Sequence, residues 1–196
     1  MGTREEKKLA TRRALVDAAA GLFAERGVDG TTMDAIARAA GTSRTSVFNY
    51  FGYKEMILCE IGARYVADLA GPLRSPARRS ARQRLFDMVD VVAEVAERQP
   101  ELLSAIAREM THPEPARRRQ ASETMQYGAV VEGVLDLLEA TGRLQDGHPR
   151  DSCASTIVDM VAGAVVRAGG EFPLSRLRRE LRIRVDVFLT GVLKPA

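Results

Sequence analysis

The chain of 196 residues contains few of the side chains that hold metals or form disulfides, with two cysteines and two histidines. Their positions match none of the spacings typical of a zinc site. The sequence also lacks a Gly-rich phosphate loop and a nucleophile elbow, and its carboxylates are scattered along amphipathic segments. We therefore expect no metal and no cofactor, and we predict that the protein is not an enzyme.

Long hydrophobic runs are lacking as well. No apolar stretch approaches the roughly 18–20 residues that cross a bilayer. The opening residues, MGTREEKK, have no apolar core of the kind found in secretory signals. These absences predict a cytoplasmic protein without a membrane partner. In that reducing compartment Cys59 and Cys153 are expected to be buried thiols, and a regulatory disulfide is the alternative.

Acidic residues are relatively scarce in the first part of the chain. Residues 1–54 hold 9 Lys and Arg against 6 Asp and Glu, whereas residues 55–196 hold 20 of each kind. The whole formal surplus of +3 therefore lies in the first 54 residues. A basic module beside a neutral body is typical of a protein that binds nucleic-acid phosphates. Because the surplus is small, motifs have to support this interpretation.

Alternation of polar and apolar residues is sustained nowhere, so we predict an all-α protein. Helix signals recur instead. Thr3 and Glu6 have the capping-box spacing, Gly27 follows the first helix, and Gly71-Pro72 is expected to end another. About nine helices are predicted. Eight cover residues 3–26, 31–40, 42–51, 54–70, 100–110, 116–140, 151–168 and 174–193, and one follows the linker 73–80 and carries Leu85, Met88, Val89, Val92 and Val95.

The most informative segment is residues 31–58, TTMDAIARAAGTSRTSVFNYFGYKEMIL. Thr31 or Thr32 is placed to cap a short helix that has Asp34 in its first turn, and Gly41 ends that helix. Hydroxyl residues then start a second short helix. Two short helices joined by a turn that contains glycine predict a helix-turn-helix unit, whose second helix enters the DNA major groove.

The same segment carries a family resemblance. The runs Ala39-Ala40-Gly41-Thr42-Ser43, Val47-Phe48-Asn49-Tyr50-Phe51 and Gly52-Tyr53-Lys54-Glu55 resemble the motif of the TetR family of bacterial transcriptional regulators, over about residues 10–58. Thr42 stands where the family usually has valine, and it keeps a buried methyl group. Phe48 stands where tyrosine is common, so a phosphate contact through a hydroxyl is missing here.

The resemblance implies two domains. A three-helix, helix-turn-helix DNA-binding domain would occupy residues 1–53, and a larger helical domain over residues 54–196 would bind an effector and dimerise. The function implied is a sequence-specific transcriptional regulator, more often a repressor than an activator, released from a palindromic operator by a small lipophilic effector. Its partners would be double-stranded DNA, that effector and a second copy of the chain. The alternative is a dimeric helical ligand-binding module without operator-specific DNA binding.

Side chains on and around the second short helix are candidates for DNA contact. Arg44 is the candidate for reading sequence, because arginine can bond guanine bidentately, and a phosphate contact or a solvated position is the alternative. The basic N-terminus forms either an arm for the minor groove or a solvated end. Val47 and Phe51 are expected in the core. The predicted DNA-binding residues are Arg4, Lys7, Lys8, Thr31, Thr32, Ser43, Arg44, Thr45, Phe48, Asn49, Tyr50 and Lys54.

The larger domain is expected, by the same resemblance, to hold an effector pocket and a dimer interface. Apolar and methionine side chains suit an adaptable pocket, and ordinary core packing is the alternative for each of them. The predicted pocket is lined by Met88, Val91, Leu102, Leu103, Ile106, Met110, Met125 and Val130. Apolar residues at helical spacing on the last two helices are expected to pair with their copies, and packing within one subunit is the alternative. The predicted interface consists of Ile157, Val161, Val165, Leu177, Leu181, Val185 and Phe188.

Overall fold

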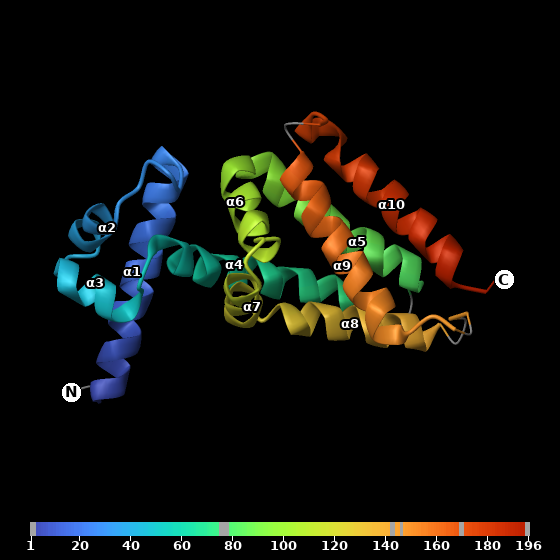
Figure 1. Cartoon of the computed structure of the whole chain (residues 1–196), viewed down its shortest axis with the longest axis horizontal. Helices are drawn as coiled ribbons and strands as arrows, with labels where there is room; N and C mark the ends of the chain where they lie inside the picture. The colour runs from blue at the N-terminus through green and yellow to red at the C-terminus, as the bar shows by residue number, and fades with distance from the viewer. Residues whose placement is uncertain (1–2, 75–78, 142–143, 146, 169–170, 195–196) are drawn as a thin grey trace. The chain divides into compact units, whose positions relative to one another are not determined.

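The computed structural model describes residues 3–74, 79–141, 144–145, 147–168 and 171–194. These residues form ten α-helices, which confirms the predicted all-α class (Figure 1). None of these helices combines the length and hydrophobicity needed to cross a membrane. The elements are α1 (Arg4–Arg26), α2 (Met33–Ala39), α3 (Arg44–Tyr50), α4 (Lys54–Leu73), α5 (Ala81–Arg98), α6 (Pro100–Met110), α7 (Pro115–Thr124), α8 (Tyr127–Ala140), α9 (Arg150–Arg167), the 3-10 turn η1 (Leu174–Arg176) and α10 (Leu177–Val192).

Two predicted helix bounds were wrong. The single helix expected over residues 116–140 is divided into α7 and α8, because Gln126 adopts a left-handed backbone with φ 54°. The break separates a polar helix from a more apolar one and leaves Met125 fully buried at the corner. Helix α4 continues through Pro72 to Leu73, whose carbonyl accepts a hydrogen bond from the guanidinium of Arg84.

The chain divides into two compact units, residues 1–62 and 63–196, and the division falls inside α4. The predicted boundary, after residue 53, lies before this division, which falls after residue 62. The first turns of α4 belong to the N-terminal unit because their side chains bond to it. The Lys54 ammonium donates to the carbonyl of Val28 at 2.7 Å, and Arg12 of α1 forms an ion pair with Glu60 at 2.6 Å.

The N-terminal unit is built around apolar side chains from α1 to α4. Its first helix starts with the predicted capping box, in which Thr3 and Glu6 bond each other's backbone N–H groups. Val47 and Phe51 are fully buried, as predicted. The Arg12 guanidinium lies over the Phe51 ring at 4.5 Å, a cation–π contact that covers the core on that side. The buried core of this unit consists of Leu15, Val16, Ala19, Phe23, Ile36, Ala37, Val47, Phe51, Ile57, Leu58, Cys59 and Ile61.

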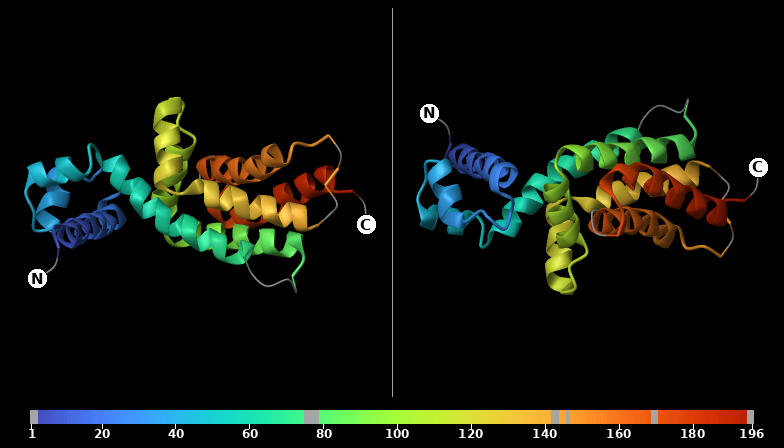
Figure 2. Two further views of the ribbon diagram at one scale, coloured as in Figure 1. Left: turned by 90° about the horizontal axis from the view of Figure 1, so that it is seen from below. Right: turned by 90° about the horizontal axis from the view of Figure 1, so that it is seen from above.

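The C-terminal unit is a bundle in which α9 packs against α6, α8 and α10, and α10 also packs against α5. Figure 2 shows these helices lying alongside one another in two views. Ion pairs reinforce the seam between α5 and α10, where Asp90 accepts bonds from Arg182 and Arg82 pairs with Asp186 at 2.7 Å. Cys59 and Cys153 are buried and unbonded to each other, as predicted, and burial raises the pKa of the Cys153 thiol.

Gly30, in the turn after α1, has no room for a side chain. A Cβ atom there would lie 2.3 Å from the carbonyl oxygen of Arg26. We expect Gly30→Ala to lower the free energy of unfolding by about 1–3 kcal/mol, because the backbone must shift to relieve the clash. Denaturant unfolding measures the change. Gly21→Ala is the matched control, since its Cβ meets nothing within 4 Å and helix propensity predicts a gain of about 0.5–1 kcal/mol. A loss at Gly21 as large as that at Gly30 would contradict this account.

Candidate nucleic-acid interface

Helices α2 and α3 form the predicted helix-turn-helix unit. The hydroxyl of Thr32 caps α2 by accepting from the N–H of Ala35 at 3.2 Å, and that of Ser43 caps α3 by accepting from the N–H of Ser46 at 3.0 Å. Gly41 in the turn has φ +64°, a conformation that favours glycine. Buried Val47 then fixes which face of α3 points inward, so the opposite face is presented to solvent.

Arg44 opens the outward face of α3. Its side chain is 70% exposed and pairs with Asp34 of α2, with Nε 3.1 Å from Oδ1 and Nη1 donating to Oδ2 at 3.3 Å. The guanidinium also lies 5.6 Å from the centre of the exposed Phe48 ring. An acid on one helix and a ring one turn along therefore hold the guanidinium at the surface. From the sequence, Asp34 was predicted only to lie in the first turn of a helix. Its pairing with Arg44 was not predicted, because it depends on the geometry of the turn between the two helices.

Most of the other predicted DNA-contacting side chains lie on the surface. Thr45 and Asn49 are exposed on α3, and Tyr50 is half-buried at its end. Thr32 and Ser43 are exposed at their caps. Arg4, Lys7 and Lys8 are exposed too, but they occupy the first turns of α1. The capping box makes these residues helical, and their contact with DNA stays a prediction.

Thr31 does not belong in this set. Only 2% of the surface of Thr31 is exposed, and its hydroxyl donates to the carbonyl of Gly27 at 2.8 Å. Its N–H donates to the carbonyl of Val28. Both polar groups of Thr31 are therefore used inside the fold, which corrects the prediction that it faces phosphate.

Lys54 has an internal role that the sequence did not indicate. Its ammonium donates to the carbonyls of Val28, Thr31 and Asp29 at 2.7, 3.3 and 3.4 Å. These carbonyls belong to the turn between α1 and α2, so the bonds join the start of α4 to that turn. The sequence could not indicate this role, because every residue has a backbone carbonyl and the acceptors of Lys54 therefore leave no pattern of residue types.

The predicted effector-pocket residues lie in different surroundings. Met88, Leu102, Ile106, Met125 and Val130 are buried in the core, and Leu103 is half-buried. The two remaining residues, Val91 and Met110, line different surface clefts. Core packing, the alternative considered for each residue, accounts for the five buried ones.

The predicted dimer interface needs correction. Ile157, Val161, Val165, Leu177, Leu181 and Val185 are buried by their own subunit, and Phe188 is half-buried. They face neighbouring helices of the same chain because α9 and α10 pack on each other. The apolar side chains that α9 and α10 leave exposed are instead Val166, Ile183 and Val187, the last with 67% of its surface accessible.

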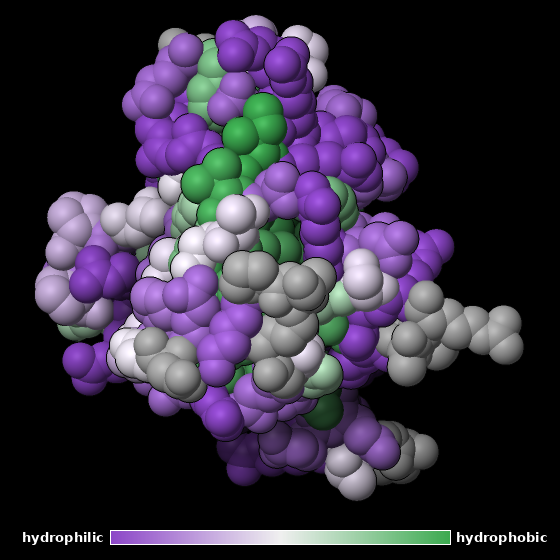
Figure 3. Space-filling view, turned by 90° about the vertical axis from the view of Figure 1, so that its right-hand side faces the viewer, coloured by the Kyte–Doolittle hydropathy of each residue, from purple (hydrophilic) through white to green (hydrophobic). Residues whose placement is uncertain are grey.

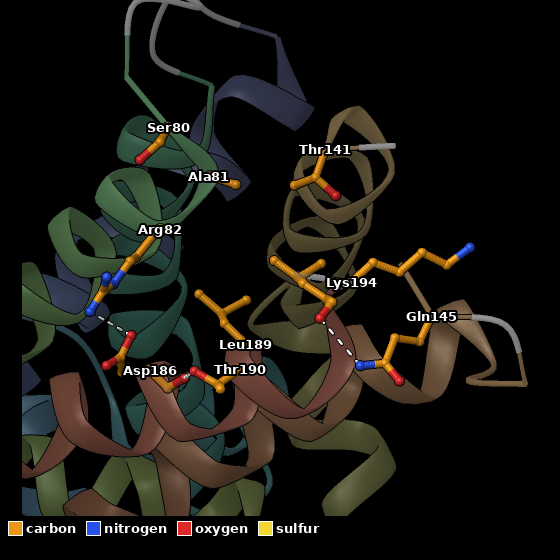
Figure 4. Close-up of a pocket in the computed structure, with 10 residues that line it drawn as sticks. Ser80, Ala81, Arg82, Thr141, Gln145, Asp186, Leu189, Thr190 and Lys194 are labelled. Atoms are coloured by element: carbon orange, nitrogen blue, oxygen red, sulfur yellow. Dashed lines mark hydrogen bonds and ion pairs between the residues drawn. The ribbon is translucent and has the colours of Figure 1, made fainter. Parts of the chain in front are cut away.

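A cleft of about 520 Å³ lies where the start of α5, the end of α8 and the end of α10 meet (Figure 4). Its polar groups bond one another: Arg82 pairs with Asp186 at 2.7 Å, Thr190 donates to the carbonyl of Asp186, and the Gln145 amide donates to the carbonyl of Leu193. The close-up shows the Lys194 side chain pointing away from these pairs. The bond from Gln145 to Leu193 joins the segment after α8 to the end of α10. The polar groups of this cleft therefore hold elements of the fold together.

A helix-turn-helix unit that presents a fixed arginine, hydroxyls and an amide, joined to a separate helical bundle, defines the class of DNA-binding regulators. Within that class the chain belongs to the TetR family. Residues 15–61 match the family described as bacterial regulatory proteins, tetR family. Residues 74–191 match the C-terminal domain of TetR/AcrR family transcriptional repressors. The resemblance seen in the sequence is thereby confirmed.

Individual relatives cover the chain to different extents. The transcriptional repressor KstR2 of Rhodococcus jostii is 43% identical over 67 residues, which are 34% of this chain and 33% of that protein. The regulator BetI of Rhizobium meliloti is 41% identical over 66 residues. The chain thus matches about a third of the length of these curated relatives.

The solved structure of Thermus thermophilus FadR, a TetR-family repressor in complex with lauroyl-CoA, is similar over nearly the whole chain. Its TM-score is 0.82 and its identity 28%, covering 94% of this chain and 96% of that one. A TetR regulator from Rhodococcus sp. RHA1 has a TM-score of 0.72 at 17% identity, covering 93% and 96% of the two chains, which shows a shared fold.

The hydrogen bonds of Lys54 predict a measurable loss of stability when its charge is removed. Lys54→Met keeps the aliphatic stem and deletes the donors, so we expect the free energy of unfolding to fall by about 1–3 kcal/mol. Denaturant titration measures this. Lys8→Met is the control, because Lys8 is exposed on α1. Equal stabilities of the two variants would show that these bonds contribute nothing.

Proposed function

We propose that the protein is a transcriptional repressor of the bacterial cytoplasm. It binds a palindromic operator as a homodimer and is released from it by a small lipophilic effector. The observation that carries the proposal is the outward face of α3, where Arg44 is held between Asp34 and Phe48. An exposed arginine at the start of a recognition helix is suited to bidentate bonds with guanine.

The exposed residues around Arg44 supply the rest of the contact surface. Thr45 and Asn49 lie on the same outward part of α3 and can reach base edges or phosphates. The Phe48 ring has no hydroxyl for a phosphate, and it suits apolar contact with a thymine methyl group. Thr32, Ser43, Tyr50 and the basic first turns of α1 would contact the backbone. Lys54 contributes indirectly in this proposal, by holding the turn on which α2 starts.

The dimer would form through a face of α9 and α10 that its own chain leaves uncovered. Val166, Ile183 and Val187 are exposed there, and Ile183 and Val187 lie four residues apart on one side of α10. Figure 3 shows a stripe of hydrophobic side chains with hydrophilic borders on one face of the molecule. In a two-fold interface this apolar face would pack on the same face of a second copy. Two recognition helices about 34 Å apart then read two half-sites.

An acyl-CoA is the class of effector that we propose. FadR, the relative bound to lauroyl-CoA, is similar over 94% of this chain with a TM-score of 0.82. The C-terminal unit of this protein has an aliphatic core that includes the buried Met88 and Met125, and such side chains can repack around an acyl chain. This agrees with the lipophilic effector expected from the sequence.

Selection of duplexes from randomised DNA by the purified protein tests DNA recognition. At about 0.15 M salt we expect enrichment of an inverted repeat, and lauroyl-CoA should release it. Arg44→Ala should weaken the selected site by about 1–3 kcal/mol and relax preference at one base position in each half-site. Loss of equal size on scrambled DNA would assign Arg44 to phosphate contact. Absence of any enriched repeat would favour a ligand-binding module without operator binding.

Sedimentation velocity tests the dimer. At micromolar concentration we expect a species of twice the 21.4 kDa chain mass. Val187→Asp should shift it to the monomer, because a charge would be buried at the centre of the apolar face. Leu9→Asp, at an exposed leucine of α1, is the control and should stay dimeric. A wild-type protein that sediments as a monomer would refute the interface, and a dimeric Val187→Asp would place it elsewhere.

A further inference from the structure

A second cleft, distinct from the one at the end of α10, opens within the C-terminal unit. It has a volume of about 560 Å³ and is lined by residues from the end of α6, from α7, and from α8 and α9. That volume lies in the range of small-molecule sites. Beside the cleft, half-buried Arg117 of α7 donates two bonds of 2.8 Å to the buried carboxylate of Glu109 in α6. This pair joins α6 to α7, two of the helices that line the cleft.

One wall of this cleft holds a polar group without a partner. The hydroxyl of Tyr127, the first residue of α8, is inaccessible to solvent and forms no hydrogen bond. A buried hydroxyl without a partner destabilises a fold, and phenylalanine would fill the same space without that cost. Burial, followed by the negative charge of Asp159, raises the pKa of this hydroxyl, so it stays protonated and able to donate. Because the hydroxyl is closed to solvent, an entering ligand reaches this donor only when side chains that line the cleft change rotamer.

Charged side chains stand at the mouth of the cleft. Arg118 and Arg119 line it from α7, and Glu123 and Asp159 line it as well. The backbone carbonyl of His112 accepts a bond of 2.6 Å from Arg118, which positions that guanidinium. Arg119 is exposed. The cleft thus offers cations for an anionic group and carboxylates for N–H or O–H donors, beside the apolar Met110 and Val131.

We propose that this cleft binds the coenzyme A portion of an acyl-CoA effector, with phosphate on Arg118 and Arg119 and a hydrogen bond donated by Tyr127. The inference rests on the effector class proposed above and assigns it a place in the fold. Coenzyme A matches the mixed lining because it combines phosphates with amide and amino donors, which a free fatty acid lacks. Guanidinium groups bind phosphate by charge-assisted bonds. The apolar residues of the cleft would contact the start of the acyl chain.

Calorimetric titration of the full-length protein with lauroyl-CoA, free coenzyme A and laurate tests this site. Arg119→Ala should weaken lauroyl-CoA by about 10-fold or more, the range for a bond to a charged group, and leave laurate unchanged. Tyr127→Phe should weaken lauroyl-CoA by about 3–10-fold while raising the Tm of the free protein by about 2–4 °C. A purely structural tyrosine would not change affinity and stability in opposite directions.

Two matched variants serve as controls. Arg108→Ala removes an exposed arginine of α6 outside the cleft. Tyr65→Phe removes a hydroxyl that already donates to Gln99 at 3.0 Å, so it should not raise the Tm. Both should bind lauroyl-CoA as the wild type does.

The outcomes separate this site from the proposed function. Lauroyl-CoA affinity that is unchanged in Arg119→Ala and Tyr127→Phe would overturn the site, and release of the operator by lauroyl-CoA would still support the effector class. Equal weakening of laurate and lauroyl-CoA would also overturn it, because the phosphates would then be irrelevant. If lauroyl-CoA does not bind the wild type, both the proposed site and the proposed effector class are wrong. DNA recognition is then still tested separately, by the selection of operator sequences.

Discussion

The geometry of the helix-turn-helix unit depends on the hydrogen bonds that the Lys54 ammonium donates to the turn between α1 and α2. That turn sets where α2 begins, the caps at Thr32 and Ser43 set where each short helix starts, and Val47 sets which face of α3 points outward. A single cation at the start of α4 thus holds a turn that contributes no apolar side chain to the buried core. Its energetic role is to give these carbonyls a charged donor, and the carbonyl of Val28 accepts from the N–H of Thr31 as well.

The sequence predicted the helix-turn-helix unit well because its signals are local. Caps, a glycine turn and the spacing of Val47 and Phe51 are set by neighbours within a few residues, and all of them appear where expected. Thr31 was misplaced because two adjacent threonines have equal capping chemistry, and only the fold decides which one caps. The pairing of Asp34 with Arg44 was not predicted, since it depends on the angle between two helices.

Non-local features were predicted less well, for one physical reason. An apolar stripe shows that a helix face is covered, and it does not show by what. Leu177, Leu181 and Val185 form such a stripe on α10, and helices of the same chain cover it. The shorter pair Ile183 and Val187 lies on another side of α10 and stays exposed. Likewise, the division of residues 116–140 into α7 and α8 turns on the backbone of Gln126, a residue whose type gives no strong signal.

The backbone conformation of Gln126 has a consequence for how the C-terminal unit could respond to a bound ligand. A non-glycine residue in the left-handed region holds about 1–2 kcal/mol of conformational strain. This strained residue directly precedes Tyr127, so it sits at the joint between the two helices that wall the proposed coenzyme A cleft. Coupling free energies between sites in regulated proteins are about 1–3 kcal/mol. The strain at this corner is therefore of the size that allosteric coupling requires, and it lies beside the fully buried Met125, where α7 meets α8.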